Sequence, residues 1–245
     1  IEFRGADGLY INGKPFGDKL MGVNRHQDYA YIGNAVPNNL HWLDVKKMRD
    51  AGFRIIRSAH YPQDPAFMDA CDELGMFIIV ATPGWQYWNP EPVFEERILS
   101  DIRNMVRRDR NHPSVLLWEP VLNETAFPES FAQNAYRATH EEYPAPGCYA
   151  AIDDKSKGAM GYDVVYTAPK NEAFYRNAGK SCFTREYGDC VDDWNSHNSY
   201  SRVAREWGEE PQIRQAQHYA RKDYGGSLTV DQFYKSPRGH IGGAL

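Results

Sequence analysis

Two acidic residues in the 245-residue sequence follow aliphatic runs and are of a type that could share one reaction. Glu124 ends the stretch LLWEPVLNE, and Glu186 ends the stretch SCFTRE. A pair of carboxyl groups can hydrolyse a glycosidic bond when one is protonated and assists the departing oxygen while the other is ionised. A glutamate in a turn is more often a solvated surface charge, so this hypothesis requires a fold that brings Glu124 and Glu186 together.

The residues near the two glutamates would support this chemistry. Arg57, within the run FRIIRSA, would keep Glu186 ionised by charge pairing. The amide of Asn123 can both donate to and accept from a sugar hydroxyl. We expect a less polar setting near Trp118 to raise the pKa of Glu124, so that this residue serves as the proton donor.

Further side chains that bind hydroxyls or stack on rings follow the other aliphatic runs. Trp85 or Trp88 offers a flat apolar face to a pyranose ring, although packing or an interdomain contact explains these tryptophans equally well. A lone histidine or arginine at a strand end is more often a satisfied core group, so only convergence of several such residues favours a binding role. The remaining candidates are His26, His60, Tyr166 and Asp189.

The elements that must position these residues alternate in type along the chain. Short aliphatic runs are separated by helical stretches, which is typical of βα units around a parallel sheet. One helix is marked by Asp64 as N-cap, Pro65 in its first turn and Gly75 at its end. The runs give seven strands and the start of an eighth in IGGAL. The sequence therefore predicts a (β/α)8 TIM barrel, truncated within the eighth strand, whose strands end on one rim.

Composition argues against several other classes of protein. The formal net charge is −5 and the basic residues are scattered, so no basic stripe is present for a nucleic-acid backbone. No apolar run approaches the length of a membrane span. The four cysteines form neither close metal-ligand pairs nor a dense disulfide scaffold, and we interpret them as mostly buried thiols. We therefore expect no nucleic acid, membrane or cofactor as a partner.

Four longer stretches resemble the catalytic barrel of glycoside hydrolase family two, which includes β-galactosidases and β-glucuronidases. DGLYINGKPFGDKLMGVNRHQD is similar to the start of that barrel, and IIRSAHYPQDPAFMDACDELGMFII is similar to its second and third strands. RDRNHPSVLLWEPVLNET is similar to the segment of the acid/base residue, and FTREYGD is similar to the segment of the nucleophile. The resemblance spans nearly the whole chain and implies a carbohydrate substrate.

The resemblance also implies roles for the candidate residues. Glu124 would be the acid/base residue and Glu186 the nucleophile of a retaining double displacement, with carboxyl groups about 5 to 5.5 Å apart. Arg57 would support the nucleophile, and Asn123 would contact the sugar 2-hydroxyl. The subsite of the non-reducing sugar would be lined by His26 and His60, with Asp189 as a further hydroxyl ligand.

Two departures from the family pattern concern residues beside the acid/base. The segment reads WEPVLNE, so Glu119 and Pro120 stand where serine and leucine are common in the family. Trp85 and Tyr87 stand where metal-dependent members carry an acidic residue and a histidine. We therefore predict that no magnesium ion binds at that position.

Two further departures concern the nucleophile and the end of the chain. The tyrosine that usually contacts the nucleophile is replaced, because its nearest positions hold Pro169 and Lys170. Tyr166 or Tyr175 is the candidate to take its place. The chain ends at Leu245, before the tryptophan that floors the sugar pocket in the family, so we expect an incomplete barrel with less core burial.

These features favour a retaining β-glycosidase, and β-galactosidase is the leading assignment because GVNRHQD resembles that branch more than the mannosidase branch. A β-glucuronidase is the alternative, and it would need a cationic or amide clamp for the uronate carboxylate. A barrel that binds carbohydrate without turnover is the alternative from a different class.

The opening IEFRGADGLYINGK resembles the exit from a β-sandwich domain of the kind that precedes the barrel in this family. We therefore expect residues 1–245 to be a catalytic barrel from a larger polysaccharide-degrading chain, without its accessory β-sandwich domains and the end of its barrel. The sequence leaves the compartment open, and secretion or a periplasmic location is compatible with such a substrate.

Overall fold

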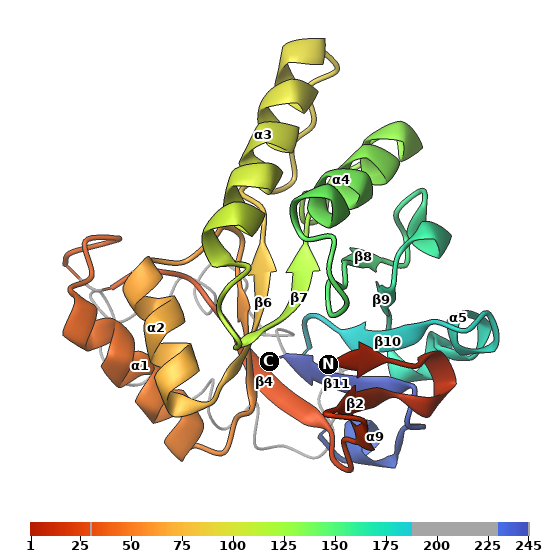
Figure 1. The fold of residues 1–245 in the computed structure, drawn as a ribbon, viewed down its shortest axis with the longest axis horizontal. Coiled ribbons are helices and arrows are strands. Elements are labelled where there is room, and N and C mark those ends of the chain that lie inside the picture. Colours follow the sequence, from red (N-terminus) through yellow and green to blue (C-terminus); the bar gives the residue numbers. More distant parts are fainter. Residues whose placement is uncertain (30, 188–229, 245) are drawn as a thin grey trace, which may run out of the picture.

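The computed structural model describes residues 1–29, 31–187 and 230–244. Within these ranges, eight parallel strands form one curved sheet in the order β7-β6-β5-β4-β11-β10-β9-β8 (Figure 1). The last strand, β11, lies between β4 and β10, as a ring of strands in chain order requires. The strands are β4 (Leu20–Arg25), β5 (Ile55–Ser58), β6 (Phe77–Ala81), β7 (Val115–Glu119), β8 (Ala151–Asp153), β9 (Val164–Tyr166), β10 (Ser181–Thr184) and β11 (His240–Ala244).

The two outer strands of this sheet, β7 and β8, meet and bring the barrel close to full closure. Trp118 forms an isolated parallel bridge with Ala150, and its backbone N–H donates to the Tyr149 carbonyl at 2.9 Å. Strand β11 pairs with β10 along one edge and with β4 along the other, so the sheet is continuous across it. The predicted (β/α)8 barrel is confirmed.

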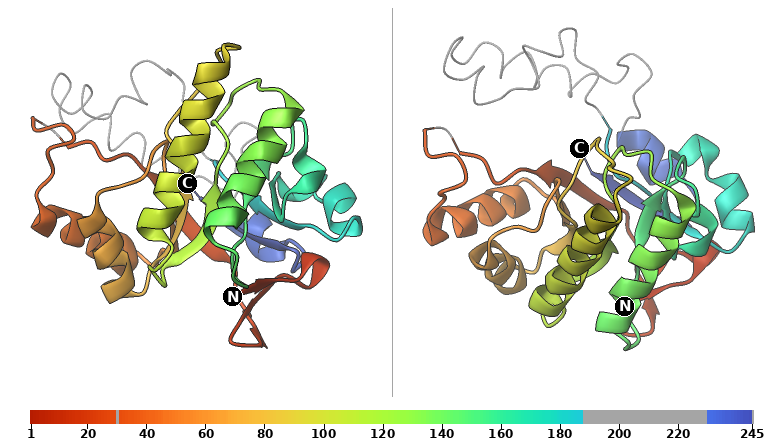
Figure 2. Two further views of the ribbon diagram at one scale, coloured as in Figure 1. Left: turned by 45° about the horizontal axis from the view of Figure 1, so that its top comes forward. Right: turned by 90° about the horizontal axis from the view of Figure 1, so that it is seen from above.

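Helices cover the outside of the barrel (Figure 2). The signals predicted for α2 are confirmed, because Asp64 Oδ1 accepts from the Ala66 N–H at 2.8 Å and Gly75 adopts a left-handed conformation. No helix in the described ranges has both the length and the apolar character that crossing a bilayer requires. The helices are α1 (Asn38–Asp50), α2 (Pro65–Leu74), α3 (Pro92–Asp109), α4 (Glu129–Glu142), α5 (Ala173–Asn177) and α9 (Val230–Lys235), with short 3-10 turns η1 (Gly5–Asp7), η2 (Ala159–Gly161) and η3 (Pro169–Asn171).

Glycines at two positions let neighbouring strands approach closely. A Cβ atom on Gly22 of β4 would lie 1.9 Å from the Ile55 carbonyl oxygen, and one on Gly242 of β11 would lie 1.9 Å from the Leu20 carbonyl oxygen. Any larger residue would therefore push β4 away from β5 or β11 away from β4. These two glycines keep the barrel wall intact below the rim.

Alternation along the strands places two charged residues inside the barrel. Ile56 of β5 packs in the cluster between the sheet and the helices, so its neighbour Arg57 faces the barrel interior. Trp118 of β7 packs in the same outer cluster, so Glu119 also faces inward. The carboxyl ends of β5 and β7 thus bring an arginine and a glutamate together within the barrel.

The N-terminal segment packs on the barrel as a small antiparallel sheet of β1 (Glu2–Phe3), β2 (Leu9–Ile11) and β3 (Lys14–Pro15). Phe3 and Phe16 pack against the inner cluster of the barrel, and the Ser181 hydroxyl donates to the Gly5 carbonyl at 3.2 Å. Because Ser181 is the first residue of β10, this segment covers the amino ends of the strands and leaves the carboxyl ends uncovered.

Candidate active site

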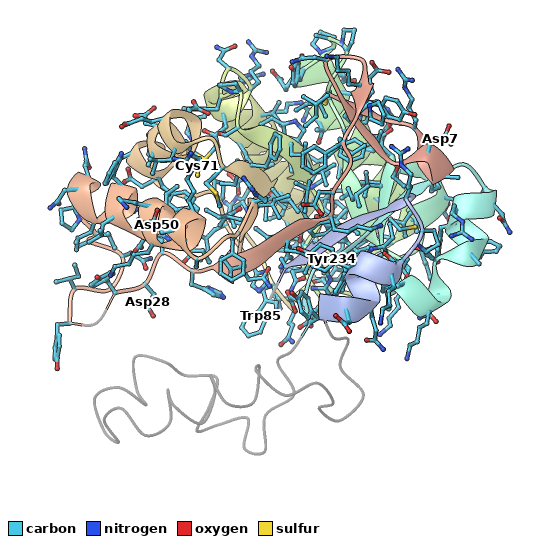
Figure 3. The ribbon with its side chains drawn as sticks, turned by 90° about the horizontal axis from the view of Figure 1, so that it is seen from below. Asp7, Asp28, Asp50, Cys71, Trp85 and Tyr234 are labelled. Carbon is cyan, nitrogen blue, oxygen red and sulfur yellow. The ribbon has the colours of Figure 1, made fainter. Side chains whose placement is uncertain are left out.

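The predicted site residues that the structure describes, all except Asp189, lie where the strands end, on the side of the molecule opposite the N-terminal segment. Trp85, which follows β6, and Asp28, which follows β4, project on one side of the barrel, whereas Asp7 of η1 lies on the other (Figure 3). Arg57 of β5 and Glu186, which follows β10, meet at this rim with a nitrogen–oxygen distance of 2.8 Å. The predicted contact between these two residues is therefore present.

The main carboxylate partner of Arg57, however, is Glu119. Arg57 is fully buried, and its Nε and Nη2 donate to the two oxygens of Glu119 at 2.7 and 2.6 Å. Its Nη1 donates to Glu186 Oε1 at 2.8 Å and to Asn24 Oδ1 at 3.1 Å. Burial works to raise the pKa of Glu119, but the charge and hydrogen bonds of Arg57 outweigh it and leave that pKa below its usual value.

The two tyrosines that were expected to contact the nucleophile form hydrogen bonds with other residues. The Tyr166 hydroxyl is buried and donates to Glu119 Oε2 at 3.1 Å. The Tyr175 hydroxyl donates to the Asp154 carbonyl at 3.1 Å. Neither tyrosine therefore replaces the family tyrosine that contacts the nucleophile, and Tyr166 instead completes the buried pair of Arg57 and Glu119.

One end of the Asn123 amide is buried without a hydrogen-bond partner among the described residues. Its Oδ1 accepts from Arg57 Nη2 at 3.2 Å and from Arg185 Nη1. Both donors are cationic, so they fix the amide orientation and leave Nδ2 as the other end. That buried Nδ2 lacks a hydrogen-bond partner, and is therefore a donor that a ligand hydroxyl can satisfy.

Glu124 is held by two neutral donors from the segment after β6. Its Oε2 accepts from Gln86 Nε2 at 2.7 Å and from Trp85 Nε1 at 3.2 Å. Partial burial works to raise the pKa of Glu124, but these bonds, with the nearby charge of Arg185, lower it below its usual value. The expectation of a raised pKa is therefore wrong, because the side chain is 38% exposed and bonded rather than set in an apolar pocket.

The donors to Glu124 also bear on the prediction that no magnesium ion binds beside this residue. The Trp85 indole cannot ligate a cation, and Gln86 turns its amide N–H rather than its carbonyl oxygen toward Glu124 Oε2, so these side chains as placed do not form a magnesium site. Across residues 1–29, 31–187 and 230–244, no group of three histidine, cysteine, aspartate or glutamate side chains has the arrangement of a metal site. The prediction that no magnesium binds here stays a prediction.

Three aromatic side chains form a row along the rim. His26 meets His60 edge-to-face at 5.4 Å between ring centroids, and His60 stacks on Trp85 at 5.9 Å. Burial and the charge of Arg57 lower the pKa of His26, and the same causes lower the pKa of His60 to about 4. Both imidazoles are therefore neutral near pH 7, with one donor and one acceptor each for hydroxyl groups.

Arg185 and Asp153 lie at the site but were not predicted from the sequence. Arg185 Nε and Nη2 donate to Asp153 Oδ2 at 3.0 and 2.7 Å, and its Nη1 donates to Glu186 Oε1 at 3.2 Å. Arg185 Nη2 also lies 3.8 Å from Glu124 Oε1. Both residues stand at strand ends, so collecting every polar residue at such ends would have included them. Asp189, by contrast, lies outside the described residues.

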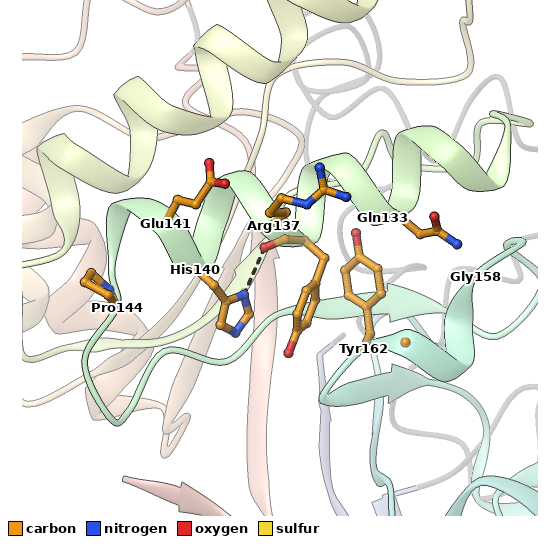
Figure 4. A pocket seen from close by; sticks show the side chains of 9 residues that line it. Gln133, Arg137, His140, Glu141, Pro144, Gly158 and Tyr162 are labelled. Carbon is orange, nitrogen blue, oxygen red and sulfur yellow. Dashed lines mark hydrogen bonds between the residues drawn. The ribbon is translucent and has the colours of Figure 1, made fainter.

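A cavity of about 550 Å³ lies elsewhere on the barrel, between α4 and the segment that contains η2 (Figure 4). Its walls include Tyr136, His140, Pro144 and Tyr162. The His140 imidazole stacks on the Tyr136 ring at 4.0 Å between centroids. None of the predicted site residues lines this cavity, so it is separate from the rim.

Comparison with protein families gives a match over the first part of the chain. The family described as "Glycosyl hydrolases family 2, TIM barrel domain" matches residues 1–145. A β-galactosidase of Thermoanaerobacterium thermosulfurigenes is 39% identical over 140 residues, which is 56% of this chain and 19% of the relative. The chain thus spans about a fifth of the length of this curated relative.

Solved structures resemble the chain along more of its length. A β-glucuronidase of Bacteroides uniformis superposes with a TM-score of 0.72 and 23% identity, covering 99% of this chain and 32% of that one. A β-glycosidase of Bacteroides vulgatus superposes with a TM-score of 0.61 and 26% identity, covering 76% of this chain and 25% of that one. These likenesses confirm the barrel fold.

Proposed function

Because the chain belongs to glycosyl hydrolase family 2, we propose that it is the catalytic barrel of a retaining β-glycosidase. The observation that carries the proposal is the convergence of the two glutamates on one guanidinium. Arg185 lies 3.2 Å from Glu186 and 3.8 Å from Glu124, measured between nitrogen and oxygen. Two carboxyl groups that flank one binding site are what hydrolysis by double displacement requires.

In the first step, the protonated carboxyl of Glu124 gives its proton to the glycosidic oxygen while a carboxylate oxygen of Glu186 attacks the anomeric carbon. The bond between that carbon and the leaving oxygen breaks, the leaving group departs as an alcohol, and Glu186 becomes a glycosyl ester. The separation of about 5 to 5.5 Å between carboxyl groups that this chemistry needs stays a prediction.

In the second step, Glu124 acts as a carboxylate and takes a proton from water. The water oxygen attacks the anomeric carbon and Glu186 leaves as a free carboxylate, so the configuration is inverted twice and retained overall. The lowered pKa of Glu124 favours this step, in which the residue is a base, and disfavours the first step, in which it is an acid.

The side chains at the rim suit a sugar with several free hydroxyls. The unpartnered Nδ2 of Asn123 supports a contact with the 2-hydroxyl, as the family resemblance implies. Neutral His26 and His60 can each donate to or accept from a hydroxyl. Trp85 is 54% exposed and stacks on His60, which supports a role as a platform for a sugar ring beside the acid/base.

For the terminal sugar we propose galactose. A relative that is 39% identical over 140 residues is named a β-galactosidase, and a relative that is 33% identical over 118 residues is named a putative β-glucuronidase. The solved β-glucuronidase of Bacteroides uniformis is 23% identical and supports the fold alone. A glucuronidase would need a cation for the uronate carboxylate. The described arginines at the carboxyl ends of the strands already pair with protein carboxylates, Arg25 with Asp44, Arg57 with Glu119 and Arg185 with Asp153.

We also propose that the whole protein carries accessory domains beside this barrel. The chain covers 19% of its β-galactosidase relative, which leaves most of that relative outside the matched region. Such domains would add contacts to the leaving group of a larger carbohydrate.

The proposal is tested by trapping the intermediate in the full-length protein. A 2-deoxy-2-fluoro-β-galactosyl fluoride should add one fluorosugar, and peptide mapping should locate it on Glu186. The glucuronyl analogue serves as the matched probe for the alternative sugar. An adduct on another residue would refute the nucleophile assignment. Galactose binding without an adduct and without turnover of any chromogenic β-glycoside would favour the non-catalytic barrel.

A further inference from the structure

We propose that Arg185 is a positioning residue for both glutamates, acting as a second arginine that orients Glu186 and as the cation that faces Glu124. This inference rests on the proposed function, since it assigns Arg185 a part in the same reaction. It is carried by the hydrogen bonds of Arg185 to Glu186 and Asn123, by its anchoring on Asp153, and by its distance from Glu124.

Two guanidinium groups meet one oxygen of Glu186. Oε1 accepts from Arg57 Nη1 at 2.8 Å and from Arg185 Nη1 at 3.2 Å. The described residues form no hydrogen bond to Oε2 of Glu186. Two donors on a single oxygen hold Oε1 in place, so Oε2 is the oxygen that we assign to attack the anomeric carbon.

Arg185 is itself held in place by hydrogen bonds to neighbouring side chains. Two of its nitrogens, Nε and Nη2, donate to Asp153 Oδ2, and the arginine side chain is only 16% exposed. Nη1 also donates to Asn123 Oδ1, the same oxygen that Arg57 contacts. The guanidinium therefore spans from β8 to the segment after β7 and cannot swing away without breaking bonds at both ends.

The Oε1 atom of Glu124 lies 3.8 Å from Arg185 Nη2. This is a charge contact rather than a hydrogen bond. The other groups that face Glu124 are Gln86 and Trp85, which are neutral donors, and His60, which is neutral near pH 7. Arg185 is therefore the permanent cation beside Glu124 among the described residues, and it favours the ionised form that the second reaction step uses.

The test compares variants of the full-length enzyme on a chromogenic β-galactoside across pH. Arg185→Gln removes the cation, and Arg185→Lys keeps the charge without the forked donors. We expect kcat/KM to fall on the order of 10- to 100-fold in Arg185→Gln, because a hydrogen bond to a charged group is lost. We also expect the alkaline limb of its pH profile to move to higher pH, because Glu124 loses its neighbouring cation.

Two further variants separate positioning from mere stability. Asp153→Asn weakens the anchor of Arg185. We expect kcat/KM of the double variant Asp153→Asn/Arg185→Gln to be no lower than that of Arg185→Gln alone. Arg107→Gln removes an exposed arginine that pairs with Glu142 far from the rim, and should leave kcat/KM and both pH limbs unchanged. In Arg185→Lys, the alkaline limb should stay near that of the wild type while kcat/KM still falls.

Wild-type kcat/KM and wild-type pH limbs in Arg185→Gln would overturn the inference while leaving the proposed function intact. A loss of kcat/KM with no movement of the alkaline limb would also overturn it, because a purely structural role predicts that result. If the wild type neither turns over a β-glycoside nor forms a fluorosugar adduct, the proposed function itself fails.

Discussion

Replacement of Glu119 by glutamine should destabilise the barrel strongly. Glu119 and Arg57 form a pair whose side chains are 3% and 0% exposed, joined by two hydrogen bonds of 2.6 and 2.7 Å. Glutamine keeps the shape but removes the charge, so Arg57 remains buried with Glu186 as its one carboxylate partner among the described residues. Breaking a buried pair in this way costs about 3 to 5 kcal/mol.

This cost is large relative to the stability of a domain, which is typically about 5 to 15 kcal/mol. For a chain of this size, each kcal/mol corresponds to a shift of about 2 to 4 °C in Tm, so Glu119→Gln should lower Tm by about 6 to 20 °C. Thermal and urea unfolding followed by circular dichroism would measure the change in the free energy of unfolding.

The chain offers a matched control in the less buried pair of Arg107 and Glu142. Arg107 Nε and Nη2 also donate to the two oxygens of a glutamate, at 2.7 and 2.5 Å, but Arg107 is 55% exposed and Glu142 is 14% exposed. Solvent screens this pair, so Glu142→Gln should change Tm little. Equal shifts of Tm in Glu119→Gln and Glu142→Gln would refute the reasoning, because both variants break a forked arginine–glutamate pair and the two pairs differ chiefly in burial.

The effect of Glu119→Gln should also depend on pH. The pKa of Glu119 lies below its usual value of 4.5, so the pair contributes its full stability above that pH and loses it as pH falls through the lowered pKa. The variant has no carboxyl at this position. The difference in free energy of unfolding between wild type and variant should therefore narrow at acidic pH. A difference that does not change with pH would contradict the conclusion that Glu119 is ionised in its pair with Arg57.

Three further predictions concern the rim and the thiols. Glu186→Gln should lower turnover of a chromogenic β-galactoside by at least about 1,000-fold, and near-normal activity would contradict its role as nucleophile. Gln86→Leu removes the donor at 2.7 Å from Glu124, so the pKa of Glu124 should rise and the alkaline limb of the pH profile should move to higher pH; an unmoved limb would count against this hydrogen bond. At pH 8, at most one of the four cysteines should react rapidly with a disulfide reagent before denaturant is added, and two or more rapid reactions would show that the buried thiols are misassigned. The reason is that burial raises the pKa of the thiols of Cys71, Cys148 and Cys182.

Local signals in the sequence were sufficient for the barrel and for much of the rim. The N-cap, first-turn proline and terminal glycine of α2 act within a few residues of one another, so they are readable without knowledge of the fold. The order of strands and helices follows from such signals repeated along the chain. Once a barrel is assumed, the ends of its strands predict which polar residues meet, and the contact of Arg57 with Glu186 follows.

The partners of these residues could not be predicted in the same way. Glu119 was identified only as a departure from a pattern, and its pairing with Arg57 depends on which face of β7 points inward. Arg185 directly precedes Glu186, yet its bonds to Asp153 and Asn123 join three different strands or loops. Contacts of this kind depend on the register of neighbouring strands, which spacing along one strand does not specify.

The sequence by itself therefore determined the barrel, the family and the pair of glutamates at the rim, because these follow from periodicity, turn residues and local motifs. Only the tertiary structure decided the direction in which the pKa values of Glu124 and Glu119 are shifted. Gln86 is 38 residues from Glu124 in the chain, and Arg57 is 62 residues from Glu119. A pKa depends on the groups that surround a carboxyl in space, so its direction emerges only when distant strands are brought together.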